Sequence, residues 1–360
     1  MRHSFLTLTV AVSLLLGTSL RADDFVFGRF GDYLDALRSQ AGIPGLAAAV
    51  VGTNDILWEH AFGKQDLERL VATRTDTPFE TDGLTQMFAA TLVLRCVEDG
   101  SLWLDEPIAQ FDPGSPYANA TIRQILTHTS DTPAGLVFAY RPERLEPLAS
   151  AIKACGASFH GTLAILLDRL AMADSVPGLD VIHLVPPAED IPSASAVDRY
   201  TRTLQRLATP YAVDSRGHAT PSQYTATTLT PAGGLVSTVD NLAQFDLALK
   251  GISHSSGSGV LLRADTLAAA WQAPVGAGGQ RLPHGFGWFV QTYNGEPVVW
   301  QFGVSENASS SLVVTLPARG LTMILLANSS GLVKTFELAA GDLTVSPFGR
   351  LFLRLFALGS

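Results

Sequence analysis

Residues 79–108, FETDGLTQMFAATLVLRCVEDGSLWLDEPI, decide the fold of this chain. From Met87 to Val97 the stretch is apolar enough for a buried helix, and Asp99-Gly100 ends it. Its first turn begins at Gly83, although glycine inside a helix costs about 1 kcal/mol relative to alanine. The cost is smaller in a first turn, and we expect Thr81 or Asp82 to cap the exposed N–H groups. Gly83 is therefore compatible with folding, but helix propensity does not explain why a glycine stands at this position.

The composition indicates a globular chain with a large core. It has 360 residues, of which 47% are hydrophobic and 16% charged, enough for one large domain or for two lobes that share a cleft. The net charge is -9 and the Lys and Arg residues form no cluster, so we expect no nucleic-acid partner. No group of Cys and His has metal-ligand spacing, and we expect neither a metal nor another cofactor.

The N-terminus has the layout of a secretory signal peptide. Arg2 precedes an apolar run, and small and polar residues follow, which predicts cleavage after Ala22 and a secreted or periplasmic protein. The apolar run is shorter than the roughly 20 residues that a membrane anchor needs, and we expect no transmembrane span in the mature chain. An exported chain can pair Cys96 with Cys155, but their apolar helical surroundings favour buried free thiols.

Strand patterns lie at both ends of the chain. Two strands are predicted near the N-terminus, at 46–52 and 56–63, and an antiparallel meander near the C-terminus, at 286–294, 296–303, 309–317 and 321–329. Helical periodicity occurs at 28–41 and in the tail 347–358, which we expect to pack on the sheet rather than against a membrane.

Helical segments fill the middle of the chain, except that residues 178–230 lack periodicity and are predicted to be surface loop. The economical fold is α+β, with one antiparallel sheet built from both ends, terminal helices flanking it, and an all-helical lobe inserted. We expect a single domain over residues 23–360. Its sheet lobe takes about 23–80 and 255–360, its helical lobe takes about 81–254, and a cleft lies between them.

Six segments in order carry a resemblance to a known family. They are residues 42–51 (GIPGLAAAVV), 79–108, 120–130 (ATIRQILTHTS), 230–245 (TPAGGLVSTVDNLAQF), 284–290 (HGFGWFV) and 312–330 (LVVTLPARGLTMILLANSS). Together they resemble the serine β-lactamases and penicillin-binding-protein-like hydrolases, especially the class C-like esterase and carboxypeptidase branch. The resemblance spans roughly residues 28–345 and implies the β-lactamase/transpeptidase-like fold.

That family needs a particular set of groups. A serine opens the central helix and attacks a carbonyl, and a lysine three residues later takes its proton. A Tyr-x-Asn pair relays protons and holds the substrate amide, and a Lys-Thr-Gly or His-x-Gly strand supplies a cation. Two backbone N–H groups bind the oxyanion.

The resemblance places these roles on residues that lack the required chemistry. Gly83 stands at the serine and Gln86 at the lysine, so neither a nucleophile nor a base is present. Tyr140 is kept, while Pro142 replaces the asparagine. Gln301 replaces the cationic residue of the strand, and Gly303 is kept.

Other residues have ordinary structural explanations. His128 is expected to pack through hydrogen bonds, and Tyr140 either packs at the lobe interface or contacts a ligand. Trp288, and at least one of Trp300 and Phe302, are expected in the sheet core. The Asp and Glu residues show no spacing typical of a paired-carboxylate site.

Three functions are compatible with these losses. The first is a catalytically inactive, exported pseudoenzyme that binds a peptidoglycan-like or small acyl ligand, or an envelope protein, with a helix N-terminus favouring carboxylates. The second is an active esterase or amidase whose nucleophile is Thr81, Thr85 or Ser305. The third is a structural module of a cell-envelope assembly.

Overall fold

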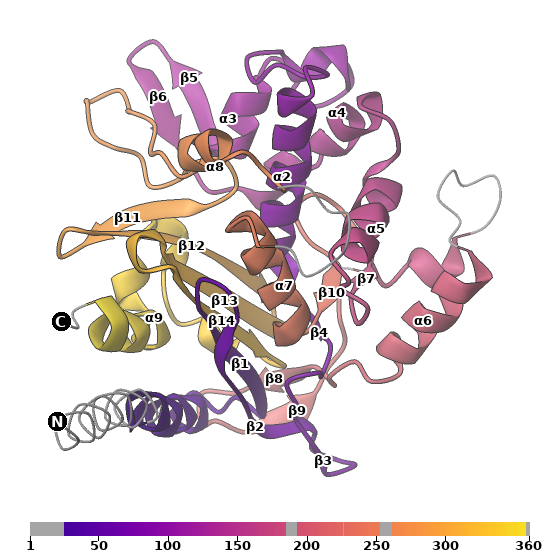
Figure 1. Ribbon diagram of the computed structural model, residues 1–360, viewed down its shortest axis with the longest axis vertical. Coiled ribbons are helices and arrows are strands. Elements are labelled where there is room, and N and C mark those ends of the chain that lie inside the picture. The colour runs from indigo at the N-terminus through magenta and orange to yellow at the C-terminus, as the bar shows by residue number, and fades with distance from the viewer. Residues whose placement is uncertain (1–24, 185–192, 226, 253–260, 358–360) are drawn as a thin grey trace, which may run out of the picture.

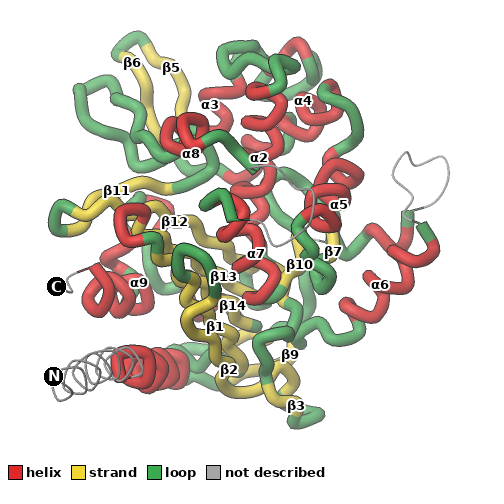
Figure 2. The backbone as a smooth tube through the Cα atoms, viewed as in Figure 1, coloured by secondary structure: helices red, strands yellow, loops and turns green. Residues whose placement is uncertain are grey.

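The computed structural model describes residues 25–184, 193–225, 227–252 and 261–357. The predicted signal peptide, residues 1–22, lies outside the described residues. A seven-stranded antiparallel sheet occupies one half of the molecule and most of the helices gather in the other half (Figures 1 and 2). The predicted α+β fold is therefore confirmed.

The large sheet joins the two ends of the chain. Its strands in spatial order are β11 Phe289–Tyr293, β12 Glu296–Ser305, β13 Ser309–Leu316, β14 Leu321–Ala327, β1 Gly45–Val51, β2 Ile56–Asp66 and β3 Val71–Ala72. Strand β1 pairs with β14 in a register that places Leu46 opposite Ala327. The predicted C-terminal meander is confirmed, with strand ends that differ by a few residues.

Alternation along the strands divides the core into two layers. One face of the sheet, including Ala47 and Ile324, packs against the central helices. The other face, including Leu46 and Leu325, packs against residues 25–40, which are helical, and against α9 Pro347–Phe352. The apolar tail therefore covers the sheet, as its periodicity predicted.

The helices of the other half surround the long helix that follows Gly83. Helix α2 Thr85–Glu98 is buried along most of its length. The other described helices are α3 Ile122–Leu126, α4 Leu148–Ala154, α5 Phe159–Arg169, α6 Ala194–Leu204, α7 Val239–Leu249 and α8 Ala264–Ala270. Two small antiparallel pairs lie outside the large sheet: β5 Thr129–Thr132 with β6 Gly135–Phe138, and β8 Tyr211–Val213 with β9 Ala219–Pro221. The inserted segment, predicted to be all-helical, therefore contains strands as well as helices.

Two local predictions were wrong. Residues 178–230 are not all loop, because α6 forms there and its own Tyr200 side chain is buried. Cys96 and Cys155 are not free thiols but form a disulfide between the end of α2 and the residue that follows α4, with 6.1 Å between their Cα atoms. The apolar runs before both cysteines pack α2 against α4 and bring the two sulfur atoms together. Sequence spacing alone does not show that these helices are neighbours.

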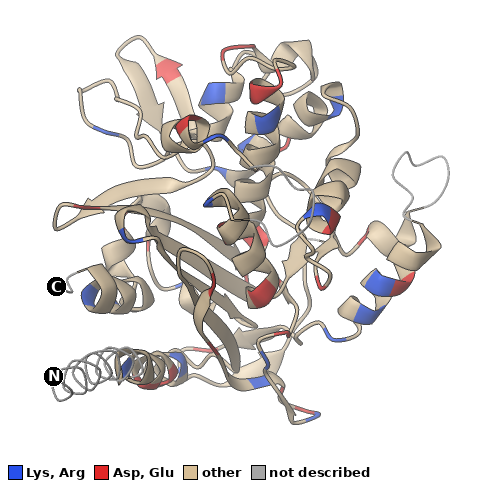
Figure 3. Ribbon diagram, viewed as in Figure 1, with Lys and Arg blue, Asp and Glu red and all other residues tan. Residues whose placement is uncertain are grey.

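No helix in the described ranges is by itself long and apolar enough to span a membrane. One bent pair, Pro142–Ala154 with Phe159–Arg169, reaches that length and composition jointly, with an angle of 77° between its members. Lys and Arg are spread over many elements rather than gathered together (Figure 3).

Candidate functional site

A small sheet leads the chain into the site. Strand β4 Phe79–Glu80 pairs with β10 Leu235–Ser237, which also pairs with β7 Val176–Pro177. The 3-10 turn η1 Asp82–Leu84 follows β4, and α2 then begins at Thr85. Asp82 has φ +51°, a left-handed conformation that Asp tolerates better than most residues do. This turn carries the chain from the small sheet to the end of β12.

The predicted capping at this turn is wrong. Neither Thr81 nor Asp82 caps the turn with its side chain. The Thr81 hydroxyl donates to the Leu235 carbonyl at 2.9 Å, and the Thr85 hydroxyl donates to the Asp82 carbonyl at 2.8 Å. Asp82 accepts a hydrogen bond from Ser309 Oγ at 2.9 Å instead. The hydroxyls are therefore committed to holding the small sheet and the turn together.

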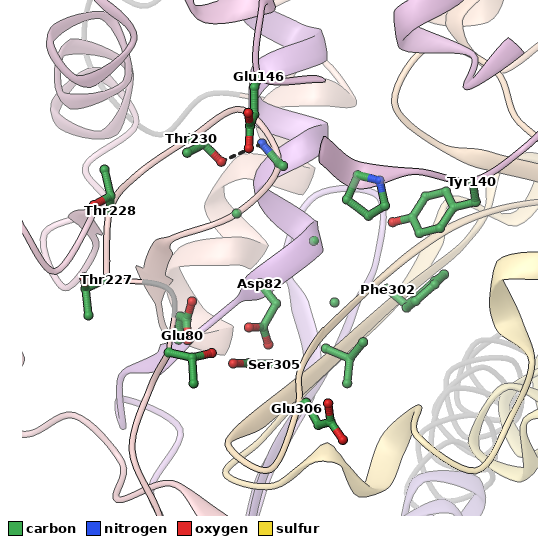
Figure 4. Close-up of a pocket in the computed structure, with 17 residues that line it drawn as sticks. Glu80, Asp82, Tyr140, Glu146, Thr227, Thr228, Thr230, Phe302, Ser305 and Glu306 are labelled. Atoms are coloured by element: carbon green, nitrogen blue, oxygen red, sulfur yellow. Dashed lines mark hydrogen bonds between the residues drawn. The ribbon is translucent and has the colours of Figure 1, made fainter. Parts of the chain in front are cut away.

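The site is a cavity of about 550 Å³ between η1, the end of β12 and the helical half (Figure 4). Four of the sequence-predicted positions lie in its wall: Gly83, Tyr140, Pro142 and Gly303. The other two, Gln86 and Gln301, are fully buried and do not contribute to the lining. The volume is in the range of pockets that hold small organic ligands.

Gly83 is packed against strand β12. A Cβ atom on Gly83 would lie less than 3.0 Å from the Phe302 carbonyl oxygen and 3.2 Å from Gly303 Cα. Gly303 is equally confined, because a Cβ there would lie less than 3.0 Å from the backbone N of Gly83. The two glycines permit this close approach of turn and strand, which explains a helix entry that propensity alone does not.

Gln86 is the centre of a neutral hydrogen-bond chain. The Arg141 backbone N–H donates to His128 Nδ1 at 3.2 Å, so His128 Nε2 carries the proton and donates to Gln86 Oε1 at 3.1 Å. Gln86 Nε2 then donates to the Tyr140 hydroxyl at 2.8 Å. Burial, followed by the nearby His284 and Arg144, holds the pKa of His128 well below its usual value. The hydrogen-bonded packing role predicted for His128 is confirmed.

The aromatic and amide groups near the cleft are also held in place. Burial raises the pKa of Tyr140 well above its usual range, so its hydroxyl stays neutral. Gln301 Nε2 donates to the Gly287 carbonyl at 3.1 Å, and its Oε1 accepts from the Phe302 N–H at 2.9 Å. Trp288 and Trp300 are buried in the core, as predicted.

A buried carboxyl pair, Glu80 and Asp82, lines the same cavity, although the spacing of the Asp and Glu residues along the chain did not indicate a paired-carboxylate site. Desolvation, followed by the charge of Asp82, raises the pKa of Glu80 to about 9. Burial raises the pKa of Asp82 to about 7, against hydrogen bonds from Ser309 and the Ser305 backbone that favour the charged form. The sequence carried no signal for this pair, because β4 ends at Glu80 and Asp82 lies in the following turn with a left-handed φ.

Comparisons with known proteins agree with this fold. The penicillin-binding protein 4 of Amycolatopsis lactamdurans is 36% identical over 112 residues, and the esterase EstB of Burkholderia gladioli is 34% identical over 110 residues. These matches cover 29% and 27% of this chain and 29% and 28% of the two relatives, so the chain matches less than a third of their length.

Solved structures cover more of the chain. The octameric penicillin-binding protein homologue from Pyrococcus abyssi matches with a TM-score of 0.70 and 18% identity, over 91% of this chain and 77% of that one. A class C beta lactamase from Rhodobacter sphaeroides matches with a TM-score of 0.66 and 17% identity, over 92% and 99% of the two chains. The family described as Beta-lactamase matches residues 30–160 and 177–343, and this chain therefore belongs to the beta-lactamase family.

Proposed function

We propose that this protein is an exported member of the beta-lactamase family that has lost acyl transfer and binds a ligand non-covalently in its cleft. The observation that carries the proposal is the packing at Gly83. No nucleophile stands there, and the Phe302 carbonyl occupies the space that any side chain would need.

The neighbouring base position supports the same function. Gln86 has no useful basicity, and His128 and Tyr140 use both ends of its amide. Pro142 and Gln301 offer the cleft neither a free amide nor a cation. All four losses affect the polar groups of one reaction, while the cleft between the lobes persists.

Export and ligand class belong to this proposal as well. The signal-peptide layout of residues 1–22 supports export, and the Cys96–Cys155 disulfide is typical of an oxidising compartment. Similarity to penicillin-binding proteins supports a peptidoglycan-like ligand, and a cell-envelope protein is the other partner that such a location favours.

Covalent labelling tests the loss of acyl transfer. We expect the purified protein to stay unlabelled by a fluorescent penicillin and by a fluorophosphonate, with an active penicillin-binding protein as positive control. Stoichiometric labelling that maps to a residue of the cleft contradicts the proposal.

A second candidate is hydrolysis with Ser305 as nucleophile, because one observation favours it. Of Thr81, Thr85 and Ser305, only Ser305 lines the cavity, and Asp82 lies beside it (Figure 4). Thr81 and Thr85 are fully buried. Turnover of p-nitrophenyl esters that Ser305→Ala abolishes establishes this function, whereas no turnover across a range of acyl lengths rejects it.

A further inference from the structure

We propose that the cleft binds the ammonium group of an organic amine, with the Glu80 and Asp82 carboxyls as its counter-ions and Phe302 and Tyr140 as its aromatic wall. This inference rests on the proposed non-covalent function of the cleft and names the chemical class of the ligand.

The charge of the cleft has one sign. Glu80 and Asp82 are buried in its floor, and Glu146 and Glu306 are exposed at its rim. Within the described part of the chain, no Lys, Arg or His belongs to the lining. Carboxylates that face one cavity repel anions and attract cations. The carboxylate ligand expected from the helix N-terminus would therefore meet four acidic side chains.

The buried carboxyl group of Glu80 lacks hydrogen-bond partners among the described residues. Its residue is 1% exposed, yet among the described residues neither carboxyl oxygen has a hydrogen-bond partner. Buried polar atoms without partners are uncommon, because each costs free energy that a hydrogen bond would recover. Glu80 lines the cavity beside Asp82 (Figure 4). A donor that enters the cavity would satisfy these oxygens, and an ammonium group brings three donors with its charge.

The opposite wall suits an organic cation. Phe302 and Tyr140 line the cavity across from the carboxyls (Figure 4), with their ring centroids 5.3 Å apart. Aromatic faces attract ammonium groups, and they also cover the carbon atoms that carry the charge. A bare metal ion is less suited to this site than an organic cation, since the described residues contain no group of three or more His, Cys, Asp and Glu placed to coordinate one. Calcium takes six or more oxygen ligands.

Binding of the cation is coupled to proton release. The groups that face the pair are the half-buried Tyr224, whose hydroxyl donates to the Ala208 carbonyl, and the two rim glutamates. Glu306 also pairs with Lys334 at 3.7 Å. None of these supplies a cation inside the cavity. The raised pKa values of Glu80 and Asp82 mean that protons leave when an ammonium arrives.

The experiment uses the full mature chain and calorimetry at low salt. The cationic ligand is Nα-acetyl-lysine amide, Nα-acetyl-norleucine amide is its neutral isostere, and Nα-acetyl-glutamate is the anion. We expect the lysine compound to bind at least about tenfold tighter than the norleucine compound, which corresponds to about 1.4 kcal/mol. Between pH 6 and pH 8 its affinity should rise, and the heats in two buffers of different ionisation enthalpy should report released protons.

Variants locate the site. Glu80→Gln with Asp82→Asn should lose at least about tenfold in affinity for the lysine compound, while Glu143→Gln, an exposed acid outside the cavity, should change it less than twofold. If the double variant does not fold, the wild-type protein still tests the proposal, through the pH dependence of its affinity for the lysine compound and the protons released on binding. Equal binding of the lysine and norleucine compounds, or binding of neither, overturns the proposal.

Two further outcomes separate this inference from the function on which it rests. Calcium binding that depends on Glu80 and Asp82, without amine binding, overturns the inference in favour of a metal ion. Covalent labelling by penicillin overturns the loss of acyl transfer and leaves cation selection to be judged by the calorimetry. The two failures therefore have different signatures.

Discussion

The two sides of the η1 turn differ in almost every physical respect. On the α2 side, Gly83 is packed against β12, and Gln86 lies in a neutral hydrogen-bond chain with all its partners present. On the β4 side, Glu80 and Asp82 are acidic, and Glu80 has no hydrogen-bond partner in the described part of the chain. Both sides border the cavity, but the first is packed and hydrogen-bonded, while the second leaves Glu80 without a hydrogen-bond partner. The positions that align with the family's nucleophile and base hold packed and hydrogen-bonded residues, and the unsatisfied carboxyl of Glu80 lies just before them in the chain.

The largest expected effect comes from restoring the lost pair of residues. Gly83→Ser with Gln86→Lys should lower the free energy of unfolding by about 4 kcal/mol or more. The serine overpacks the contact with β12, which costs about 1–3 kcal/mol, and the lysine places an unpaired cation in a buried position, which costs about 3–5 kcal/mol. Urea denaturation measures the loss, and nitrocefin should not be hydrolysed. Gly28→Ser, where a Cβ meets nothing within 4 Å, is the control. A stable double variant that hydrolyses nitrocefin would contradict the prediction, because it would show that a serine at position 83 and a lysine at position 86 fit the site.

Removing the disulfide should have the next largest effect, and it separates scaffold from site. Cys96→Ser with Cys155→Ser removes a link between residues 59 positions apart and should lower the free energy of unfolding by about 2–4 kcal/mol, as measured by thermal or urea unfolding. The affinity for Nα-acetyl-lysine amide should stay within twofold, since neither cysteine lines the cavity. A matching loss of amine affinity would mean that the cleft depends on the bridge.

A smaller effect is expected from breaking the neutral chain itself. Gln86→Leu removes the partner of His128 and of Tyr140 and should lower the free energy of unfolding by about 1–3 kcal/mol. Chemical denaturation measures it, with the exposed Gln223→Leu expected within about 0.5 kcal/mol of the wild type. An unchanged midpoint for Gln86→Leu would show that the chain is not needed for stability.

The smallest effect tests the acidic side through pH. The folded-state pKa of Glu80 is raised from 4.5 to about 9, so the folded chain keeps a proton that the unfolded chain releases, and stability falls as pH rises across that window. Glu80→Gln cannot titrate, so its stability should fall less steeply and exceed the wild-type value at pH 8 by about 1 kcal/mol or more.

Urea unfolding from pH 5 to pH 9 gives both profiles. Glu143→Gln should follow the wild-type profile, because this acid is exposed and lies outside the cavity. Parallel profiles for the wild type and Glu80→Gln would show that Glu80 titrates as an ordinary exposed acid.

Much of the fold was readable from the chain. Short β-rich apolar runs bounded by turn residues predicted the strands β1 and β14, and the apolar stretch after Met87 predicted α2. The helical spacing of apolar residues in the tail predicts the packing on the sheet that residues 347–357 show. Helix α6 was missed because its buried Tyr200 stands among polar residues.

The sequence by itself determined the β-lactamase-like arrangement and the absence of Ser and Lys at positions 83 and 86, because residue identity and local periodicity need no partner. Only the tertiary structure decided what those positions became. The contact of Gly83 with Phe302 joins residues more than 200 positions apart, and burial of Glu80 and Asp82 depends on β10, β12 and β13 packing around them. Close packing and desolvation are properties of the assembled neighbours, and so the acidic floor of the cleft appears only in the folded chain.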